Sequence, residues 1–340
     1  MRQIFVLPAD QRSSSGGDLY NRFLLAALRK AGAALSVMTI DEAIRDAERG
    51  RPARYWLDSL LLDCVPRFRS LLRAPSACFV IVHYFPSLQP AATARVRRSW
   101  RRMEDAAFAC ADGFFLTSIF SARELASRNL GHKPMFVVPP APVVTPGRMA
   151  RRPQPHFCAL MAASLVSGKG VFAFLEGLDA HLESSDAFSL QIAGRTDADT
   201  AYAQRCRQLV DASAVLRDKV RFLGALRPAA MKRAYAGNAF FVSASRMETF
   251  GMALQEARLF GMYVLTLDAG HAAAHVNSPA DGEILASMRA LSQRVAQLVR
   301  DPAMCGSILA AMVAPPASAT WEQAATDFLA QVRMPQRRTA

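Results

Sequence analysis

Two glutamates in the second half of the chain have the positions of a ligand-binding pair. Glu248 stands in a polar loop after the apolar run 239–244, and Glu256 follows eight residues later, inside a segment that is expected to be helical from Met252. A carboxylate before a helix and another in its early turns both face the carboxyl ends of the strands, where open α/β sheets bind ligands. The free N–H groups and positive dipole end of that helix favour phosphate. We therefore expect a phosphate-bearing ligand here.

Glycine-bounded loops follow two other expected strands. Ser167-Gly168-Lys169-Gly170 comes after the first strand of the second half, and Gly16-Gly17 comes after the first strand of the chain. Glycine lets backbone N–H groups approach an anion, and the Lys169 ammonium is a point charge suited to a diphosphate. Neither loop is a dinucleotide or Walker fingerprint, because the required glycine and Ser/Thr spacing is absent. A tight turn at Gly17 and a solvated Lys169 are the alternative interpretations.

Three further polar residues have to be weighed as chemical groups. His83 ends the apolar run CFVIVH, where a histidine is commonly structural. Asp197 and Asp199 form a D-x-D pair, but Asp199 is also well placed as a helix N-cap, so we expect no metal site. Glycoside hydrolysis by Glu248 and Glu256 is disfavoured, because it needs two carboxyl groups about 5–9.5 Å apart across one bond.

The segments that must position these groups alternate short apolar runs with amphipathic stretches. This alternation is typical of parallel sheets with helices on both faces, and 340 residues suffice for two domains. We predict an α/β protein with two doubly wound, Rossmann-like domains facing across a cleft. The expected parts are an N-terminal acceptor-side domain (1–140), a Pro- and Arg-rich linker (141–155), a C-terminal domain (156–315), and a final helix and tail (316–340) that can cross back to the N-terminal domain.

The expected elements follow from these runs. Strands are expected at 4–7, 35–40, 60–63, 79–83, 113–117 and 135–138, then at 158–162, 189–193, 220–223, 240–243 and 264–267. Helices are expected at 18–31, 66–73, 91–109, 121–129, 171–181, 199–212, 228–236, 252–260, 283–299, 302–312 and 321–332.

The segment Ala239–Asp268 resembles the E-x7-E region of retaining glycosyltransferases of the GT-B fold, family 4. The usual form of that region is approximately S-x-x-E-G-F-G-x-x-x-x-E-A-x-x-x-G-x-P-V. The chain departs from it at Thr249, where glycine is usual, and at Tyr263, where proline is usual. The matching residues are Ser245, Glu248, Phe250, Gly251, Glu256, Ala257, Gly261 and Val264.

The resemblance implies a role for each residue of this segment. Glu248 would contact hydroxyl groups of a donor sugar and is the expected catalytic residue, and Glu256 would bind the ribose of a nucleotide. Phe250, Gly251 and Met252 would present backbone N–H groups to the sugar and the phosphate. The donor is thus a nucleotide sugar, which is a co-substrate, so no cofactor and no metal are expected.

The resemblance also covers the loop around Lys169. In the family, G-R-x-x-x-x-K-G supplies an arginine and a lysine that clamp the donor diphosphate. Lys169 matches the lysine, whereas Ser164 stands where the arginine is usual. Another cation would have to substitute for it, and the candidates are Arg195, which follows a strand-end glycine, and Arg246.

Three further positions extend the resemblance. The Gly-Gly loop at Gly17 matches one that lines the cleft near the donor diphosphate and the acceptor. His83 matches a strand-end histidine that reaches the donor sugar, and with Glu248 it is an expected catalytic residue. Beyond the central segment the family usually has G-G-x-P-E, of which this chain keeps only Gly270. His271 and His275 are therefore expected to reshape the sugar pocket.

The charge distribution indicates an anionic partner. The chain has a net charge of +13, and residues 1–150 alone hold 21 Lys/Arg against 12 Asp/Glu. No recognised nucleic-acid-binding motif accompanies these charges, so nucleic acid is not expected. A packed helix with a solvated basic face and a patch for anionic lipid or a lipid-diphosphate acceptor are both consistent with them. The arginines of that helix are Arg95, Arg97, Arg98, Arg101 and Arg102.

The sequence therefore predicts a glycosyltransferase of hexosyltransferase type that moves a sugar from a nucleotide-sugar donor to a glycan or lipid-linked acceptor, with retention. A nucleotide-sugar epimerase of the same fold and a degenerate, non-catalytic homologue that binds glycan or a partner are the alternatives. Six scattered cysteines without metal-like spacing are typical of a reduced, cytoplasmic protein, here expected in the cytoplasm and in peripheral contact with the inner face of the membrane.

Overall fold

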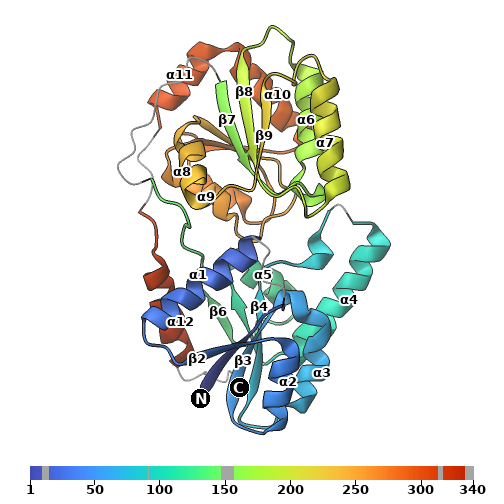
Figure 1. Ribbon diagram of the computed structural model, residues 1–340, viewed down its shortest axis with the longest axis vertical. Coiled ribbons are helices and arrows are strands. Elements are labelled where there is room, and N and C mark those ends of the chain that lie inside the picture. The colour runs from blue at the N-terminus through green and yellow to red at the C-terminus, as the bar shows by residue number, and fades with distance from the viewer. Residues whose placement is uncertain (10–14, 91, 147–156, 313–316, 334–340) are drawn as a thin grey trace. The chain divides into compact units, whose positions relative to one another are not determined.

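A computed structural model describes residues 1–9, 15–90, 92–146, 157–312 and 317–333 (Figure 1). The chain forms two compact units: unit 1 comprises Met1–Ala141 with Ala319–Ala340, and unit 2 comprises Pro142–Ser318. Most of the expected linker, residues 147–155, lies outside the described part of the chain.

Unit 1 contains a six-stranded sheet in the order β2-β1-β3-β4-β5-β6, and every neighbouring pair is parallel. Parallel strands need long crossovers, and helices supply them on both faces of the sheet (Figure 1). The strands are β1 (Arg2–Val6), β2 (Leu35–Met38), β3 (Ala53–Asp58), β4 (Ala77–Val82), β5 (Gly113–Leu116) and β6 (Met135–Val137). The helices are α1 (Gly16–Lys30), α2 (Ile40–Glu48), α3 (Val65–Leu71), α4 (Ala94–Cys110), α5 (Ile119–Ser127) and α12 (Trp321–Arg333), with 3-10 helices η1 (Ser59–Cys64) and η2 (Pro86–Leu88).

Helix α12 belongs to unit 1 because it packs beside α1 on one face of this sheet (Figure 1). Trp321 stacks on Phe23 with ring centroids 5.5 Å apart, and the Phe328 ring meets Trp56 at 5.2 Å. Burial of aromatic surface is the main stabilising contribution here. The ion pair Lys30–Glu322 is exposed on both sides and adds little.

Unit 2 repeats the plan with a second all-parallel sheet, in the order β12-β11-β10-β7-β8-β9. Its buried residues form one continuous core between the sheet and its helices. The strands are β7 (Phe157–Ala162), β8 (Phe188–Ala193), β9 (Val220–Gly224), β10 (Phe240–Ser243), β11 (Tyr263–Leu267) and β12 (Gly282–Leu285). The helices are α6 (Val171–His181), α7 (Thr200–Ala212), α8 (Pro228–Ala236), α9 (Met252–Leu259), α10 (Met288–Arg300) and α11 (Pro302–Ala310), with 3-10 helices η3 (Ser167–Lys169) and η4 (Ala272–His275).

One expected element is wrong, a second begins too early, and α2 was not expected. The predicted strand at 60–63 is the 3-10 helix η1, because the Asp58 carboxylate accepts a hydrogen bond from the Leu60 N–H (2.8 Å) and turns the chain out of the sheet. The strand itself is β3, whose apolar pattern is interrupted by Arg54. The first turn of the helix predicted from residue 283 is β12, an edge strand whose Ile284 is exposed, so it lacks the strong apolar run of a central strand.

The order of the strands identifies where each sheet can bind a ligand. In unit 1 the crossovers run from β1 to β2 on one side and continue with β3 on the other side of β1. In unit 2 they run from β7 through β9 and continue with β10 on the other side of β7. Ligands of doubly wound sheets bind at such reversals, beyond the carboxyl ends of the strands. The loops after β1, β3, β7 and β10 are therefore the places to search.

Candidate active site

The loop after β7 positions Lys169. Residues 167–169 form η3, and Gly170 follows in the left-handed region (φ 68°) as the N-cap of α6. A side chain at Gly170 would collide with the Ala244 carbonyl oxygen, so glycine is required both for its φ and for this close approach. The Arg246 N–H donates to the Gly168 carbonyl (3.0 Å), which ties the loop after β7 to the loop after β10.

The two loops bring Lys169 and Glu248 together. The Nζ of Lys169 lies 2.6 Å from Oε1 of Glu248, and both side chains are partly buried. Glu248 is held from behind as well, because its N–H donates to the Ala269 carbonyl (3.2 Å) and its carbonyl accepts from the His271 N–H (2.7 Å). A side chain at Gly270 would collide with that Glu248 carbonyl, which explains why this glycine of the motif is kept. A cation and a carboxylate thus lie together at the strand reversal of unit 2.

The start of α9 lies beside an aromatic cluster. Gly251 is its N-cap with φ 92°, and Met252 begins the helix. The Phe250 ring stacks on His271 (5.4 Å between centroids) and meets His275 edge-on (5.2 Å). Burial lowers the pKa of His275, and its Nε2 lies 2.7 Å from the Phe250 carbonyl oxygen, so a neutral ring donates to that carbonyl. The two histidines hold Phe250 in place. The backbone N–H groups that follow it, at Gly251 and Met252, lie at the start of α9.

Glu256 is turned to the backbone of unit 2. Its Oε1 accepts hydrogen bonds from the N–H groups of Val143 (2.8 Å) and Val144 (3.1 Å), and only 6% of the residue is exposed. Burial raises the pKa of Glu256, partly offset by these N–H donors and by Tyr235. The carboxylate therefore secures the segment that enters unit 2 before β7. The ribose contact implied for Glu256 stays a prediction.

The two candidate substitutes for the arginine of the clamp lie in different surroundings. Arg195 makes two hydrogen bonds to Asp197, from Nε (2.9 Å) and Nη2 (3.0 Å). The Arg246 side chain is exposed, and its own backbone N–H makes the contact with Gly168. Asp199 accepts from the Tyr202 N–H (3.0 Å) at the start of α7, which confirms its predicted N-cap role.

In unit 1, Gly17 and His83 are in direct contact. A Cβ on Gly17 would lie 3.1–3.3 Å from three carbon atoms of the His83 side chain, so glycine lets α1 approach the ring. The Nε2 of His83 lies 2.9 Å from the Asn21 Oδ1 and 3.3 Å from the Asp58 Oδ2. Since both are acceptors, Nε2 carries a proton.

Asp58 and Asn21 are functional candidates that the sequence reasoning missed. The Nδ2 of Asn21 donates to Asp58 Oδ2 (2.7 Å), and both residues are buried. Burial acts to raise the pKa of Asp58, but the charge and hydrogen bond of His83, with help from Leu60 and Asn21, hold it below its ordinary value. The signal for Asp58 was its position at the carboxyl end of β3, the same type of position that identified His83. Asp58 was missed because the sequence predicted this strand at residues 60–63, after Asp58, instead of at Ala53–Asp58.

The described residues contain neither a candidate metal-binding cluster nor a candidate membrane-spanning helix. No group of three or more His, Cys, Asp and Glu side chains among them could hold a metal ion. None of their helices has the length and apolar character needed to cross a bilayer.

Comparison with solved structures assigns the class of this fold. The chain is similar to a sucrose-phosphate synthase from Thermosynechococcus elongatus over 98% of both chains (TM-score 0.76, 17% identity). It is also similar to the apo form of the lipopolysaccharide outer core galactosyltransferase WaaB, over 98% of this chain and 99% of that one (0.66, 12%). A third neighbour is Anabaena Alr3699/HepE in complex with UDP and glucose, over 96% and 95% (0.66, 14%). The predicted fold is thereby confirmed: two doubly wound parallel sheets of GT-B type.

Sequence comparison is informative for unit 2. Residues 157–301, from the start of β7 to the residue before α11, match the family described as "Glycosyl transferases group 1". This range contains Lys169, Glu248 and Glu256. No curated protein matches the chain. The family match is limited to this range, and the solved structures show the fold of the whole chain.

Proposed function

We propose that the protein transfers a hexose from a nucleotide-sugar donor to a glycan or lipid-linked acceptor, with retention at the anomeric carbon and without a metal ion. The observation that carries the proposal is the Lys169–Glu248 pair at the strand reversal of unit 2, beside the N-terminus of α9. The match of residues 157–301 to a glycosyltransferase family and the neighbour solved with UDP and glucose support it.

The chemistry of transfer needs a stabilised diphosphate leaving group and an orienting group for the sugar. In the proposed reaction the Lys169 ammonium and the N–H groups at Gly251 and Met252 take up the charge of the diphosphate as the glycosidic bond breaks. Glu248 accepts hydrogen bonds from sugar hydroxyls, and Phe250 lies against the sugar. Arg195 or Arg246 supplies the second cation, since Ser164 provides no charge, and Glu256 is retained as the proposed ribose contact.

Unit 1 is proposed to bind the acceptor. Its own reactive group is His83, which Asn21 and Asp58 hold against Gly17 at the strand reversal. A ring held by a buried carboxylate on Nε2 has one orientation, which suits a group that must meet the reacting sugar.

Contact with an anionic membrane in the cytoplasm is proposed as a secondary property of α4. Arg95, Arg98 and Arg102 are exposed along this helix together with Val96, whose side chain is one of the few large exposed apolar groups. Basic side chains beside an exposed apolar residue favour attachment to anionic lipid. Arg97 and Arg101 of the same predicted set make contacts within unit 1 instead.

The proposal is tested by measuring binding and turnover separately. A calorimetric panel of UDP, GDP and ADP identifies the base, and Lys169→Met is expected to weaken the nucleotide that binds. Incubation of the corresponding sugar nucleotides with and without acceptor extracts then distinguishes the reactions. Transfer only with acceptor supports the proposal, an altered sugar nucleotide without acceptor indicates an epimerase, and nucleotide binding without any conversion indicates a non-catalytic homologue. Absence of binding by every nucleotide would exclude the donor site.

A further inference from the structure

A pocket of about 310 Å³ lies in unit 1 between η2 and the first half of α4. Its size is at the lower end of the range for small-ligand sites. One of its lining residues, Ser87, stands four residues after His83, in the segment that follows the carboxyl end of β4. The lining residues are Ser87, Leu88, Ala94, Arg97, Arg98 and Arg101.

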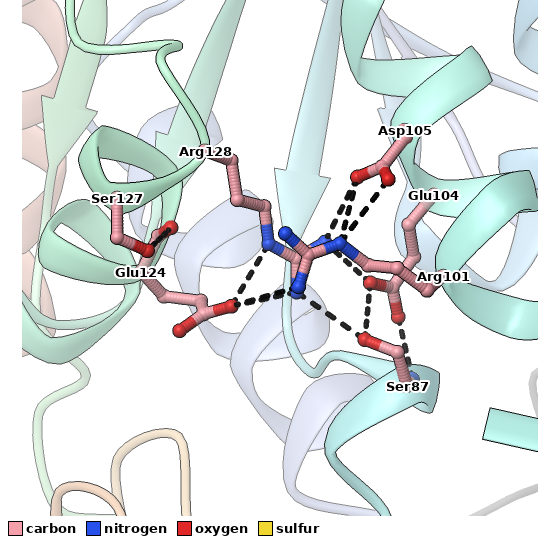
Figure 2. Close-up of polar contacts among 7 residues, drawn as sticks. All are labelled: Ser87, Arg101, Glu104, Asp105, Glu124, Ser127 and Arg128. Carbon is pink, nitrogen blue, oxygen red and sulfur yellow. Dashed lines mark hydrogen bonds and ion pairs between the residues drawn. The ribbon is translucent and has the colours of Figure 1, made fainter. Parts of the chain in front are cut away.

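The wall of this pocket is held rigid by a buried ionic network behind it (Figure 2). Glu104 is fully buried and accepts from both the N–H (2.7 Å) and the hydroxyl (2.6 Å) of Ser87. Arg128, whose side chain is 2% exposed, donates to Glu104 (2.5 Å) and to the Ser87 hydroxyl (3.2 Å). It also lies over the Phe85 ring, 5.0 Å from the centroid. Ser87 is thus held by two buried charged groups and cannot easily move.

The nearby carboxylates pair with Arg128 and Arg101 rather than with Arg97 or Arg98. Arg128 contacts Glu104, Glu124 (2.7 Å) and Asp105 (3.6 Å), so three acids converge on one buried arginine (Figure 2). Asp105 also forms an ion pair with Arg101 (2.9 Å) on the exposed side of α4.

The two other arginines of the pocket face no such acid. Arg97 donates to the Ala92 carbonyl (2.7 Å), which fixes its position without neutralising its charge. Arg98 is exposed, and within the described parts of the chain neither residue makes an ion pair with a carboxylate. An open surface pocket with two uncompensated guanidinium groups is suited to an oxygen-rich anion, because guanidinium forms paired hydrogen bonds to phosphate.

We propose that this pocket binds a phosphate group of the acceptor. Identifying the bound molecule as the acceptor rests on the proposed function, whereas the anion site itself does not. The phosphate can be that of a phosphorylated sugar or of a lipid-linked glycan, since both offer the same oxygens to Arg97 and Arg98. Binding there would place the acceptor on the loop that also holds His83.

The test compares arginines of one helix. Glucose 6-phosphate is titrated calorimetrically into the full-length protein and into Arg98→Ala, Arg98→Lys and Arg95→Ala. Arg95 is exposed like Arg98 but does not line the pocket, so it is the matched control. Loss of Arg98 is expected to weaken glucose 6-phosphate about tenfold or more, lysine to restore part of the affinity, and Arg95→Ala to change it little. Glucose without phosphate is expected not to bind.

Several outcomes would overturn the inference. These are equal affinities of Arg98→Ala and Arg95→Ala, equal binding of glucose, or no binding of either glucose 6-phosphate or vesicles. Flotation with vesicles of phosphatidylglycerol in phosphatidylcholine identifies the source of the phosphate. A decrease confined to Arg98→Ala assigns a lipid phosphate to the pocket. An equal decrease in both variants is the effect expected of the exposed basic face of α4, and with Arg98-dependent glucose 6-phosphate binding it assigns the pocket to a phosphorylated sugar.

Lys169→Met separates this site from the donor site. Unchanged glucose 6-phosphate binding in Lys169→Met places the anion away from unit 2, and loss of binding there refutes the pocket. If glucose 6-phosphate binding depends on Arg98 while no nucleotide binds to the protein, the pocket stands and the proposed transfer fails. If a nucleotide binds but neither glucose 6-phosphate nor vesicles bind, the pocket fails and the proposed donor site stands.

Discussion

The ammonium of Lys169 lies 2.6 Å from a carboxylate oxygen of Glu248, a residue 79 positions further along the chain. The contact crosses the strand reversal of unit 2, because one residue follows β7 and the other follows β10. The proposed diphosphate contact of Lys169 must therefore compete with Glu248. This competition makes the effects of the two residues on binding opposite in sign.

Removal of either member of this pair should separate binding from turnover. Lys169→Met is expected to weaken nucleotide diphosphate binding by about 10- to 100-fold, the effect of a lost charged hydrogen bond. Glu248→Gln is expected to bind the same nucleotide at least as tightly as the natural protein, because the ammonium is released, while transfer falls by about 100-fold or more. Calorimetry and a transfer assay measure the two effects. Weaker nucleotide binding in Glu248→Gln would contradict this account.

Arg246, rather than Arg195, is expected to supply the second cation of the diphosphate clamp. Arg195 is held by two hydrogen bonds to Asp197, whereas Arg246 is exposed and its backbone contacts Gly168 beside Lys169. We expect Arg246→Ala to weaken nucleotide binding by up to about fivefold, because a surface cation contributes about 1 kcal/mol or less. Arg195→Ala is expected to have a smaller effect. Titrations of both variants at two salt concentrations check this. A larger loss in Arg195→Ala would assign the clamp to Arg195.

The approach of α1 to His83 should not tolerate a side chain. Gly17→Ala would place a methyl group 3.1–3.3 Å from the His83 side chain, which Asn21 and Asp58 hold in place. We expect a decrease of about 1–3 kcal/mol in the free energy of unfolding of unit 1, with a loss of transfer. Gly131→Ala is the control, since its nearest contact would be 3.6 Å from Ala126. Urea unfolding followed by tryptophan fluorescence reports on unit 1, and equal stability of the two variants would argue against close packing at Gly17.

The buried carboxylate of Glu256 should make the stability of unit 2 depend on pH. Burial raises its pKa above the ordinary 4.5, so the folded protein holds the proton more tightly than the unfolded chain does. The stabilising contribution of this protonated group is complete below about pH 4.5 and is lost as the pH rises through the higher pKa of the folded state.

The comparison with Glu256→Gln isolates this contribution, because glutamine does not titrate. The difference in the free energy of unfolding, natural protein minus variant, is expected to fall as the pH rises from about 4.5 and then to level off. Urea unfolding between pH 4 and 8 measures it. A difference that rises with pH would mean that the two backbone N–H donors outweigh burial.

Local sequence patterns predicted much of the fold. Ten of the twelve strands and most of the helices agree with periodicity and turn residues, because apolar alternation and glycine positions act over a few residues. Strands β3 and β12 were not predicted, for different reasons. Arg54 interrupts a strand that is otherwise buried, and Ile284 lies on an exposed edge, so neither segment has the continuous apolar run of a central parallel strand.

The candidate site divides in the same way. Sequence alone determined which residues stand at strand ends and helix starts, including Lys169, Glu248, Gly17 and His83. Only the tertiary structure decided their partners, because those partners come from other crossovers: Glu248 for Lys169, Asp58 for His83, and the backbone of Val143 for Glu256. Strand order sets such pairs, and it depends on how whole sheets assemble, which no local spacing contains.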